Sequence, residues 1–238
     1  MTTLARSVND ASGLRSRIEA VRESIDRAAA RAGRRGADVT LVAVVKTVPV
    51  AVVGEALALG VRELGENRVQ EADAHVEALG RTAARWHMVG HLQRNKAGRA
   101  AELFDRVHSL DGVEIARALS RCAERTGRTV RALIEVNVGG EASKFGVVPG
   151  ALTALLEQAL ALPGLAVDGL MTVAPLTERP EQARPHFARL RELREAAARS
   201  LGRELPELSM GMSADFEVAV EEGATMVRVG TAIFGARA

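Results

Sequence analysis

The stretch Leu41-Val42-Ala43-Val44-Val45-Lys46-Thr47-Val48-Pro49 decides the fold. Its five consecutive apolar residues, three of them β-branched, are typical of a strand buried on both faces of a parallel sheet. The run ends at Lys46, and Pro49 suits the first turn of a following helix. Side chains at the carboxyl ends of parallel strands open onto the ligand sites of α/β proteins. Lys46 is therefore the first candidate functional residue.

The position of Lys46 allows two interpretations. An amine held against Val42, Val44 and Val45 is partly desolvated, which lowers its pKa and frees the neutral, nucleophilic form that makes a Schiff base. Alternatively, the lysine only ends the strand and extends its ammonium group to water. The stretch by itself leaves both interpretations open.

Short apolar runs alternate with helical segments along the rest of the chain. The expected strands are 40–46, 61–65, 86–90, 104–110, 130–138, 165–173, 207–210 and 226–229. The expected helices after these strands are 49–59, 68–79, one from about 95, 113–125, 151–162, 179–200 and 214–222, and 231–234 closes the chain. An additional amphipathic helix is expected before the first strand, over 8–33. This order predicts an α/β fold, a (β/α)8 TIM barrel in a single domain, 1–238. A doubly wound open sheet is the alternative, but the chain has no G-x-G-x-x-G turn.

Composition narrows the class of protein. The formal charge is +2 and aromatic residues make up 3%, so the basic stripe with stacking rings that nucleic-acid binding needs is not expected. No apolar segment is long enough to span a membrane, and a cytoplasmic protein is expected.

No metal site is expected. His87 and His91 would lie on a strand and a turn without a carboxylate partner, and Glu135 is interpreted as a structural residue paired inside the barrel.

The turns after the last two strands suggest an anion site. Gly211, Met212 and Ser213 open the helix expected at 214–222, and Gly230 and Thr231 form a second turn rich in backbone N–H groups. Barrels commonly bind phosphate at these two loops. Ordinary capping by Ser213 and tight packing at Gly230 explain each turn separately, but the two together favour a phosphate site.

A lysine combined with a phosphate site is what pyridoxal 5′-phosphate (PLP) requires. By strand alternation Arg228 shares a face with Met226 and Gly230, from which it could reach the pyridine nitrogen. An arginine donates a hydrogen bond to that nitrogen but leaves it unprotonated. The site would then hold PLP while stabilising carbanions poorly.

The chain resembles the YggS/PROSC family of PLP-binding proteins, also called PLP homeostasis proteins. The resemblance is carried by Ala43-Val-Val-Lys-Thr-Val-Pro49, Gly65-Glu-Asn-Arg-Val-Gln-Glu71, Trp86-His-Met-Val-Gly-His-Leu-Gln-Arg-Asn-Lys96, Ser143-Lys-Phe-Gly146, Gly169-Leu-Met-Thr172, Leu208-Ser-Met-Gly-Met-Ser213 and Met226-Val-Arg-Val-Gly-Thr-Ala-Ile-Phe-Gly235. It implies a barrel of the alanine-racemase N-terminal type (PLP fold type III) that acts in intracellular PLP homeostasis. It further implies PLP on Lys46 as a Schiff base, Val44 and Asn67 near the ring, Arg228 at the pyridine nitrogen, and Ser213, Gly230 and Thr231 on the phosphate.

Three functions remain to be distinguished. The first is a PLP carrier without evident turnover, with PLP-dependent apo-enzymes as recipients and with the protein itself expected to be a monomer. The second is a weak PLP-dependent amino-acid racemase. The related racemases use a lysine and a tyrosine as bases, whereas this chain has no tyrosine and no residues left for a second β-domain. The third is a lysine-dependent aldolase for a sugar phosphate, which would leave Arg228 unexplained.

Overall fold

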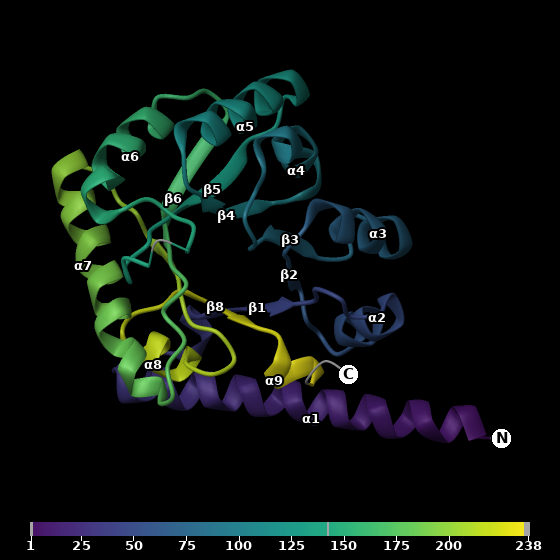
Figure 1. Ribbon diagram of the computed structural model, residues 1–238. Helices are drawn as coiled ribbons and strands as arrows, with labels where there is room; N and C mark the ends of the chain where they lie inside the picture. Colours follow the sequence, from purple (N-terminus) through teal and green to yellow (C-terminus); the bar gives the residue numbers. More distant parts are fainter. Residues whose placement is uncertain (1, 142, 236–238) are drawn as a thin grey trace.

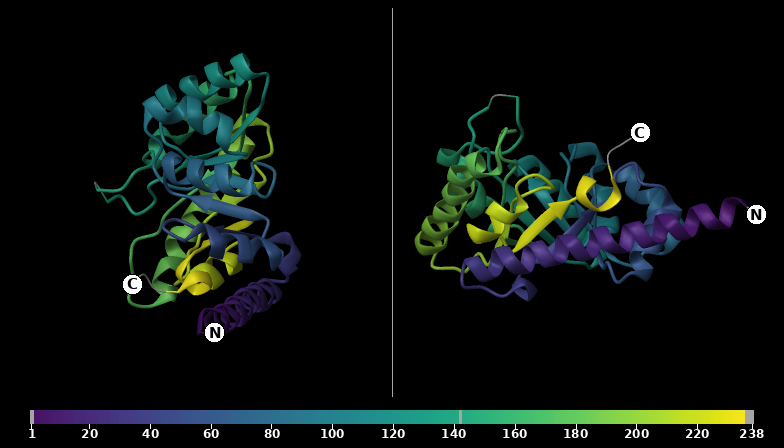
Figure 2. Two further views of the ribbon diagram at one scale, coloured as in Figure 1. Left: turned by 90° about the vertical axis from the view of Figure 1, so that its right-hand side faces the viewer. Right: turned by 90° about the horizontal axis from the view of Figure 1, so that it is seen from below.

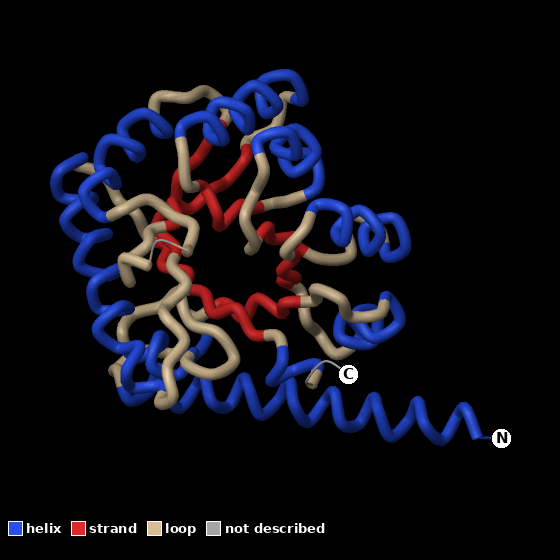
Figure 3. Tube along the Cα trace, viewed as in Figure 1, coloured by secondary structure: helices blue, strands red, loops and turns tan. Residues whose placement is uncertain are grey.

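Eight parallel strands pair in sequence order and close into a barrel (Figures 1 and 3). The computed structural model describes residues 2–141 and 143–235, so positions 1, 142 and 236–238 of the expected domain lie outside the described residues. The strands are β1 (Thr40–Val44), β2 (Glu63–Glu66), β3 (Arg85–Met88), β4 (Arg106–Leu110), β5 (Val130–Glu135), β6 (Leu165–Met171), β7 (Glu207–Ser209) and β8 (Met226–Val229). Each lies within or next to an expected strand, and the predicted (β/α)8 fold is confirmed.

Helices follow the strands and surround the ring (Figure 3). They are α1 (Thr2–Arg31), α2 (Val50–Ala58), α3 (Val69–Leu79), α4 (Ala97–Leu103), α5 (Val113–Thr126), α6 (Leu152–Leu160), α7 (Arg184–Leu201), α8 (Phe216–Glu221) and α9 (Thr231–Phe234), with 3₁₀ turns at Gly36–Asp38, Arg94–Lys96, Pro149–Ala151 and Pro180–Ala183. Pro49 immediately precedes α2 in an extended conformation, because the residue that caps a helix keeps non-helical torsion angles.

The first strand is shorter than expected. The sequence predicts a strand to Lys46, but β1 ends at Val44 and Lys46 lies in the turn that follows. On one side β1 pairs with β2, with Val44 opposite Gly65, and on the other side it closes the barrel against β8, with Val42 opposite Arg228. This closure brings the end of β1 next to the end of β8, which are far apart in the sequence.

The N-terminal helix packs along the outside of the barrel, against α8 and α9 (Figures 1 and 2). Leu14, Ile18, Val21 and Ile25, the predicted apolar stripe, are at most 5% exposed. The helix ends at Arg31 rather than at the expected residue 33, because Gly33 adopts a left-handed backbone with φ of +67°.

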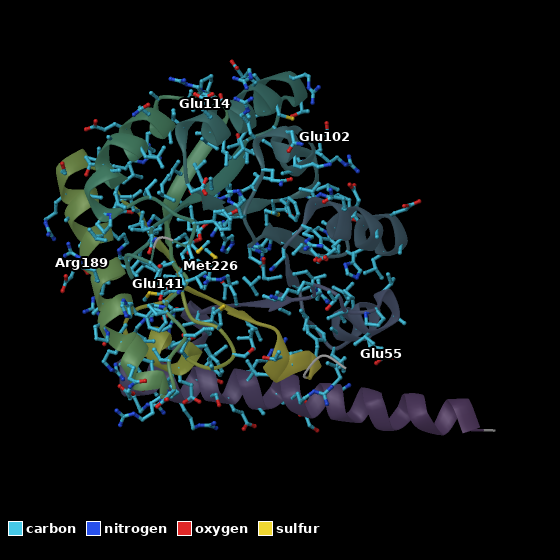
Figure 4. The ribbon with its side chains drawn as sticks, viewed as in Figure 1. Glu55, Glu102, Glu114, Glu141, Arg189 and Met226 are labelled. Carbon is cyan, nitrogen blue, oxygen red and sulfur yellow. The ribbon has the colours of Figure 1, made fainter. Side chains whose placement is uncertain are left out.

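Met226 marks the interior of the barrel. Met226 lies inside the ring of strands, whereas Glu55, Glu102, Glu114 and Arg189 lie at its periphery (Figure 4). Met226 packs with Leu133 and Met171 in a small buried apolar cluster, and the Arg106 guanidinium approaches the sulfur of Met226 at 3.3 Å.

No helix in the described part of the chain has the length and apolar character needed to cross a membrane.

Candidate functional site

Lys46 lies in a strained turn at the carboxyl end of β1. Val45 still donates its N–H to Gly65 of β2 at 2.9 Å, and the Val48 N–H returns to the Val45 carbonyl at 3.0 Å. Between them Thr47 has a φ of +61°, the only positive φ among the described non-glycine residues. A threonine held in the left-handed region costs on the order of 1 kcal/mol or more, so the surrounding structure must enforce this turn. Lys46 itself is half-buried.

A cavity of about 240 Å³ opens beside this turn. Its walls combine the end of β1 with the turn after β8, and its lining includes Val44, Lys46, Val48, Gly230 and Thr231. The ends of β1 and β8 meet because the barrel closes between these two strands. Of the residues that sequence analysis assigned to PLP, Lys46, Val44, Gly230 and Thr231 therefore share one cavity.

Ser213 joins this group through the backbone of the β8 turn. Its hydroxyl oxygen accepts the N–H of Gly230 at 3.2 Å and the N–H of Ala232 at 3.3 Å. The sequence suggested that Ser213 caps the following helix, but in the structure it does not. The helix α8 begins only at Phe216, and Asp215 precedes it and accepts the Met212 N–H at 2.6 Å. The residues of the expected anion site are thus joined to one another, with the N–H groups of the β8 turn paired to the Ser213 hydroxyl oxygen and the Met212 N–H paired to Asp215.

Gly211 is required by the path of this loop. Its φ is +90°, and a Cβ built there would lie 2.5 Å from the Cβ of Ala219 and 2.9 Å from the Cα of Phe216. Its carbonyl accepts the Arg228 N–H at 3.0 Å. Gly211 therefore positions the backbone of the loop against β8.

Arg228 is buried inside the barrel and held at two points. One of its terminal nitrogens donates to Ser209 Oγ at 2.6 Å and the other to the Thr172 carbonyl at 2.8 Å. Burial lowers the pKa of Arg228 to about 10, while the charges of Glu135 and Asp215 act in the opposite direction. The guanidinium is therefore still charged at neutral pH, and it can only donate hydrogen bonds.

Asn67 lines a different cavity. The structure places it beside Arg68, His91 and Lys96 around a space of about 650 Å³ between the ends of β2 and β3, and not in the lining of the Lys46 cavity. A Cβ on Gly90 would lie 2.4 Å from the Asn67 carbonyl oxygen, so these two strand ends pack directly on each other. The position of Asn67 near the ring remains an expectation.

Two buried residues that sequence analysis did not assign to the site hold the Lys46 turn. His75 of α3 has Nε2 3.0 Å from the Val48 carbonyl oxygen and Nδ1 2.5 Å from Glu66 Oε1. Burial raises the pKa of Glu66 to about 7, against the influence of His75. The spacing of Val69, Ala72 and His75 along one face of α3 is the signal that could have placed this histidine in the core.

The interpretation of the histidines near β3 needs correction, because both have carboxylate partners. His87 Nε2 lies 2.7 Å from Glu63 Oε2, and His91 Nδ1 lies 3.2 Å from Asp111 Oδ2. The partners come from neighbouring strands, so sequence spacing could not show them. Within residues 2–141 and 143–235, no three His, Cys, Asp or Glu side chains are grouped as a metal site would require.

Glu135 is buried at the end of β5, as expected for a residue inside the barrel. Burial raises its pKa to about 7. The negative charge of Asp111 adds to this rise and the positive charge of Arg228 opposes it. Its charged neighbours include one carboxylate and one guanidinium.

These contacts define the chemistry available at the mouth of the barrel. The cavity offers an amine and a turn of backbone N–H groups with a serine hydroxyl beside it, and the Arg228 guanidinium lies buried in the barrel outside the cavity lining. Amines form imines with aldehydes, and N–H groups with a hydroxyl bind phosphate oxygens. The arrangement fits a phosphorylated carbonyl compound.

The fold and the site define a barrel of the alanine-racemase type. The family model described as "Alanine racemase, N-terminal domain" matches residues 17–238. The solved structure of alanine racemase from Clostridium difficile 630 superposes with a TM-score of 0.72 at 14% identity and covers 95% of this chain and 57% of its own, a likeness of fold alone.

Two closer relatives refine this class. The pyridoxal phosphate homeostasis protein of Aquifex aeolicus is 46% identical over 221 residues, which cover 93% of this chain and 97% of that protein. The structure of PipY from Synechococcus elongatus PCC7942 with PLP bound has a TM-score of 0.82 at 36% identity and covers 93% of this chain and all of its own. The chain belongs to the family of pyridoxal phosphate homeostasis proteins, and the predicted resemblance is confirmed.

Proposed function

We propose that the protein binds PLP and holds it covalently on Lys46, acting as an intracellular, cytoplasmic store of the cofactor. The relatives named for PLP homeostasis and the PLP-bound structure of PipY support the choice of ligand. The single observation in this chain that carries the proposal is the cavity that combines the Lys46 amine with Gly230 and Thr231. When bound, PLP supplies an aldehyde carbon to the amine and a phosphate to the turn.

Different residues around the cavity would bind the phosphate, the ring and the pyridine nitrogen of PLP. The N–H groups of Gly230 and Ala232 both donate to Ser213 Oγ in this structure. A bound phosphate would accept these N–H groups in place of that oxygen and would also accept the Ser213 hydroxyl. The side chain of Val44 would pack on the ring, because it lines the same cavity two residues before Lys46. Arg228, fixed by Ser209 and the Thr172 carbonyl, would donate to the pyridine nitrogen.

Storage and release, rather than amino-acid turnover, is the function that this set of residues favours. An arginine that donates to the pyridine nitrogen does not protonate it, so carbanions at the ligand would gain little stabilisation. The chain also contains no tyrosine to act as the second base of a racemase. We further propose PLP-dependent apo-enzymes as recipients and a monomer as the working state.

A reduction experiment tests the covalent site. The chain has only three lysines, Lys46, Lys96 and Lys144, so borohydride reduction of the PLP complex followed by peptide mapping has few possible outcomes. We expect the label on Lys46 in the wild type, in Lys96→Ala and in Lys144→Ala, and no label in Lys46→Ala. A wild type that stays colourless and unlabelled at saturating PLP would overturn the proposal.

A second measurement separates the store from an enzyme. Amino acids incubated with the PLP-loaded protein in deuterated water would exchange their α-hydrogen if the site acted as a racemase. We expect no exchange above that of free PLP. Faster exchange that is lost in Lys46→Ala would show turnover.

A further inference from the structure

A chain of side-chain hydrogen bonds crosses the interior of the barrel. Starting at Arg228 on β8, Nη1 lies 2.6 Å from Ser209 Oγ on β7, which lies 2.8 Å from His108 Nδ1 on β4. The Nε2 atom of His108 lies 2.8 Å from Nδ1 of His87 on β3, whose Nε2 lies 2.7 Å from Oε2 of Glu63 on β2. The four side chains from Arg228 to His87 are at most 4% exposed. Five strands therefore contribute to one buried polar path.

With both histidine rings neutral, the chemistry of the two ends fixes the direction of every hydrogen bond between them. A guanidinium has only donors, so Ser209 Oγ accepts from Arg228 and has its own hydrogen free to donate to His108 Nδ1. At the other end, Glu63 also binds the Arg85 guanidinium at 2.7 Å, as a carboxylate does, and it can only accept from His87 Nε2. The middle bond then runs from Nε2–H of His108 to Nδ1 of His87. All four hydrogen bonds donate from Arg228 towards Glu63.

With neutral rings, this path predicts one defined tautomer for both histidines. Both His87 and His108 must carry their proton on Nε2 and present an unprotonated Nδ1. Burial lowers the pKa of His108 well below its usual range, and the positive charges of Arg228 and Arg106 act in the same direction, in agreement with a neutral ring.

We propose that Ser209, His108 and His87 are positioning residues that hold Arg228 in one orientation towards the ligand, with Glu63 setting the direction of the path. The positioning role rests on the proposed function of Arg228 at the pyridine nitrogen. A carboxylate in direct contact with Arg228 would compete for the N–H groups that a ligand needs. A path that ends at Glu63 places the negative charge four hydrogen bonds away and leaves the remaining guanidinium donors to the ligand.

Protonation of His87 would reverse the path. With a proton on each nitrogen, His87 donates to both Glu63 and His108. The Nε2 atom of His108 must then accept, so His108 carries its own proton on Nδ1 and donates it to Ser209. The serine oxygen would face two donors, from Arg228 and His108, which weakens its hold on the guanidinium. Glu63 and Asp105 are the carboxylates near His87, and the positive charges of Arg106 and Arg228 lower the pKa of His108.

The tautomers can be measured without any ligand. In a two-bond ¹⁵N–¹H correlation spectrum of the ¹⁵N-labelled protein near neutral pH, the five histidine rings give separate patterns, and His87→Gln and His108→Gln assign two of them. We expect both rings to be neutral with the proton on Nε2. A proton on Nδ1 of His108, or a charged ring at either position, would overturn the proposal. This result does not depend on whether PLP binds.

A pair of matched variants tests the positioning role. Glu63 and Glu207 line the same cavity at the end of the barrel away from Lys46, but Glu207 binds Arg106 and Thr225 and lies outside the path. We expect Glu63→Gln to shift the ring nitrogens of His108 and to weaken PLP binding by about threefold or more, and Glu207→Gln to do neither. Equal PLP affinities in the two variants, with the expected tautomers present, would overturn the positioning role alone.

Discussion

His75 Nε2 lies 3.0 Å from the carbonyl oxygen of Val48, so the helix α3 directly supports the turn that carries Lys46. Because a carbonyl only accepts, this nitrogen carries a proton, and the other ring nitrogen meets Glu66 Oε1 at 2.5 Å. The strained backbone of Thr47 is thus held in part by a buried pair, His75 of α3 and Glu66 of β2.

Removing this support should loosen the turn. In His75→Ala the Val48 carbonyl and the buried Glu66 carboxyl both lose a partner, which should lower the free energy of unfolding by about 2–4 kcal/mol. PLP should also attach to Lys46 more slowly, measured from the growth of cofactor absorbance after mixing. His186→Ala, a change at a half-exposed histidine of α7, is the control. Attachment of PLP at the wild-type rate in His75→Ala would show that the turn needs no such support.

Ser213→Ala should weaken the proposed phosphate contact. The substitution removes the hydroxyl that would donate to the phosphate and that orders the N–H groups of Gly230 and Ala232, so PLP affinity should fall by about tenfold or more while the fold is kept. Pyridoxal, which lacks the phosphate, should bind the wild type and the variant equally. Ser24→Ala, at a half-exposed serine of α1 that accepts a hydrogen bond from Arg27, controls for loss of a hydroxyl elsewhere. A similar loss of affinity for pyridoxal would place Ser213 away from the phosphate.

Gly211→Ala should destabilise the loop before α8. Its positive φ and the 2.5 Å approach to the Ala219 Cβ leave no room for a methyl group, so the free energy of unfolding should fall by about 2–4 kcal/mol. Gly98→Ala in α4 is the matched control, because a Cβ there meets nothing within 4 Å and should stabilise the helix by about 0.5–1 kcal/mol. Urea denaturation of both variants makes the comparison, and equal effects of the two changes would contradict the close packing at Gly211.

The buried carboxyl of Glu135 should make stability depend on pH. Its pKa rises from an ordinary 4.5 to about 7 in the folded protein, so the folded state binds this proton more tightly than the unfolded state does. The resulting contribution to stability is complete below about pH 4.5 and is lost as the pH rises through 7. Glu135→Gln removes this loss, and its gain in stability relative to wild type between about pH 5 and pH 8 should be roughly 1–3 kcal/mol.

Denaturation of wild type and Glu135→Gln at several pH values checks this prediction. The gain should be smaller than the full effect of the pKa shift, because Arg228 loses a favourable negative charge when Glu135 is neutralised. Glu178→Gln, at an exposed position, should leave the pH profile parallel to that of wild type. Parallel profiles for Glu135→Gln as well would mean that its carboxyl titrates alike in the folded and unfolded states.

The pattern of the chain predicted most of the fold. Apolar runs such as Leu41–Val45 and the stripe from Leu14 to Ile25 are local signals, since burial on both faces of a strand or on one face of a helix leaves a period in the sequence. The ends of the strands and helices were predicted less accurately than their order. The first strand stops at Val44 rather than Lys46, and α8 starts at Phe216 rather than near residue 214, because hydrogen bonds across strands and turns set these ends.

The candidate site was predictable where its residues follow strand ends. Lys46 ends one predicted strand, Ser213 and Gly230 follow two others, and the carboxyl ends of the strands in a barrel meet on one face. The contact between Ser213 and Gly230 was not predictable in detail, since it joins loops that follow two different strands. The sequence suggested a helix cap for Ser213, and only the folded loops show that its oxygen turns to β8 instead.

By itself the sequence determined the order of strands and helices, the barrel that this order implies, and the lysine, serine and glycines at its mouth, because each is encoded by neighbours a few residues away. Only the tertiary structure decided which inward side chains meet. Arg228, Ser209, His108 and His87 come from four strands and share one path only after the barrel closes. The physical reason is that closure sets the stagger between strands, and a hydrogen bond depends on that stagger to within a few tenths of an ångström.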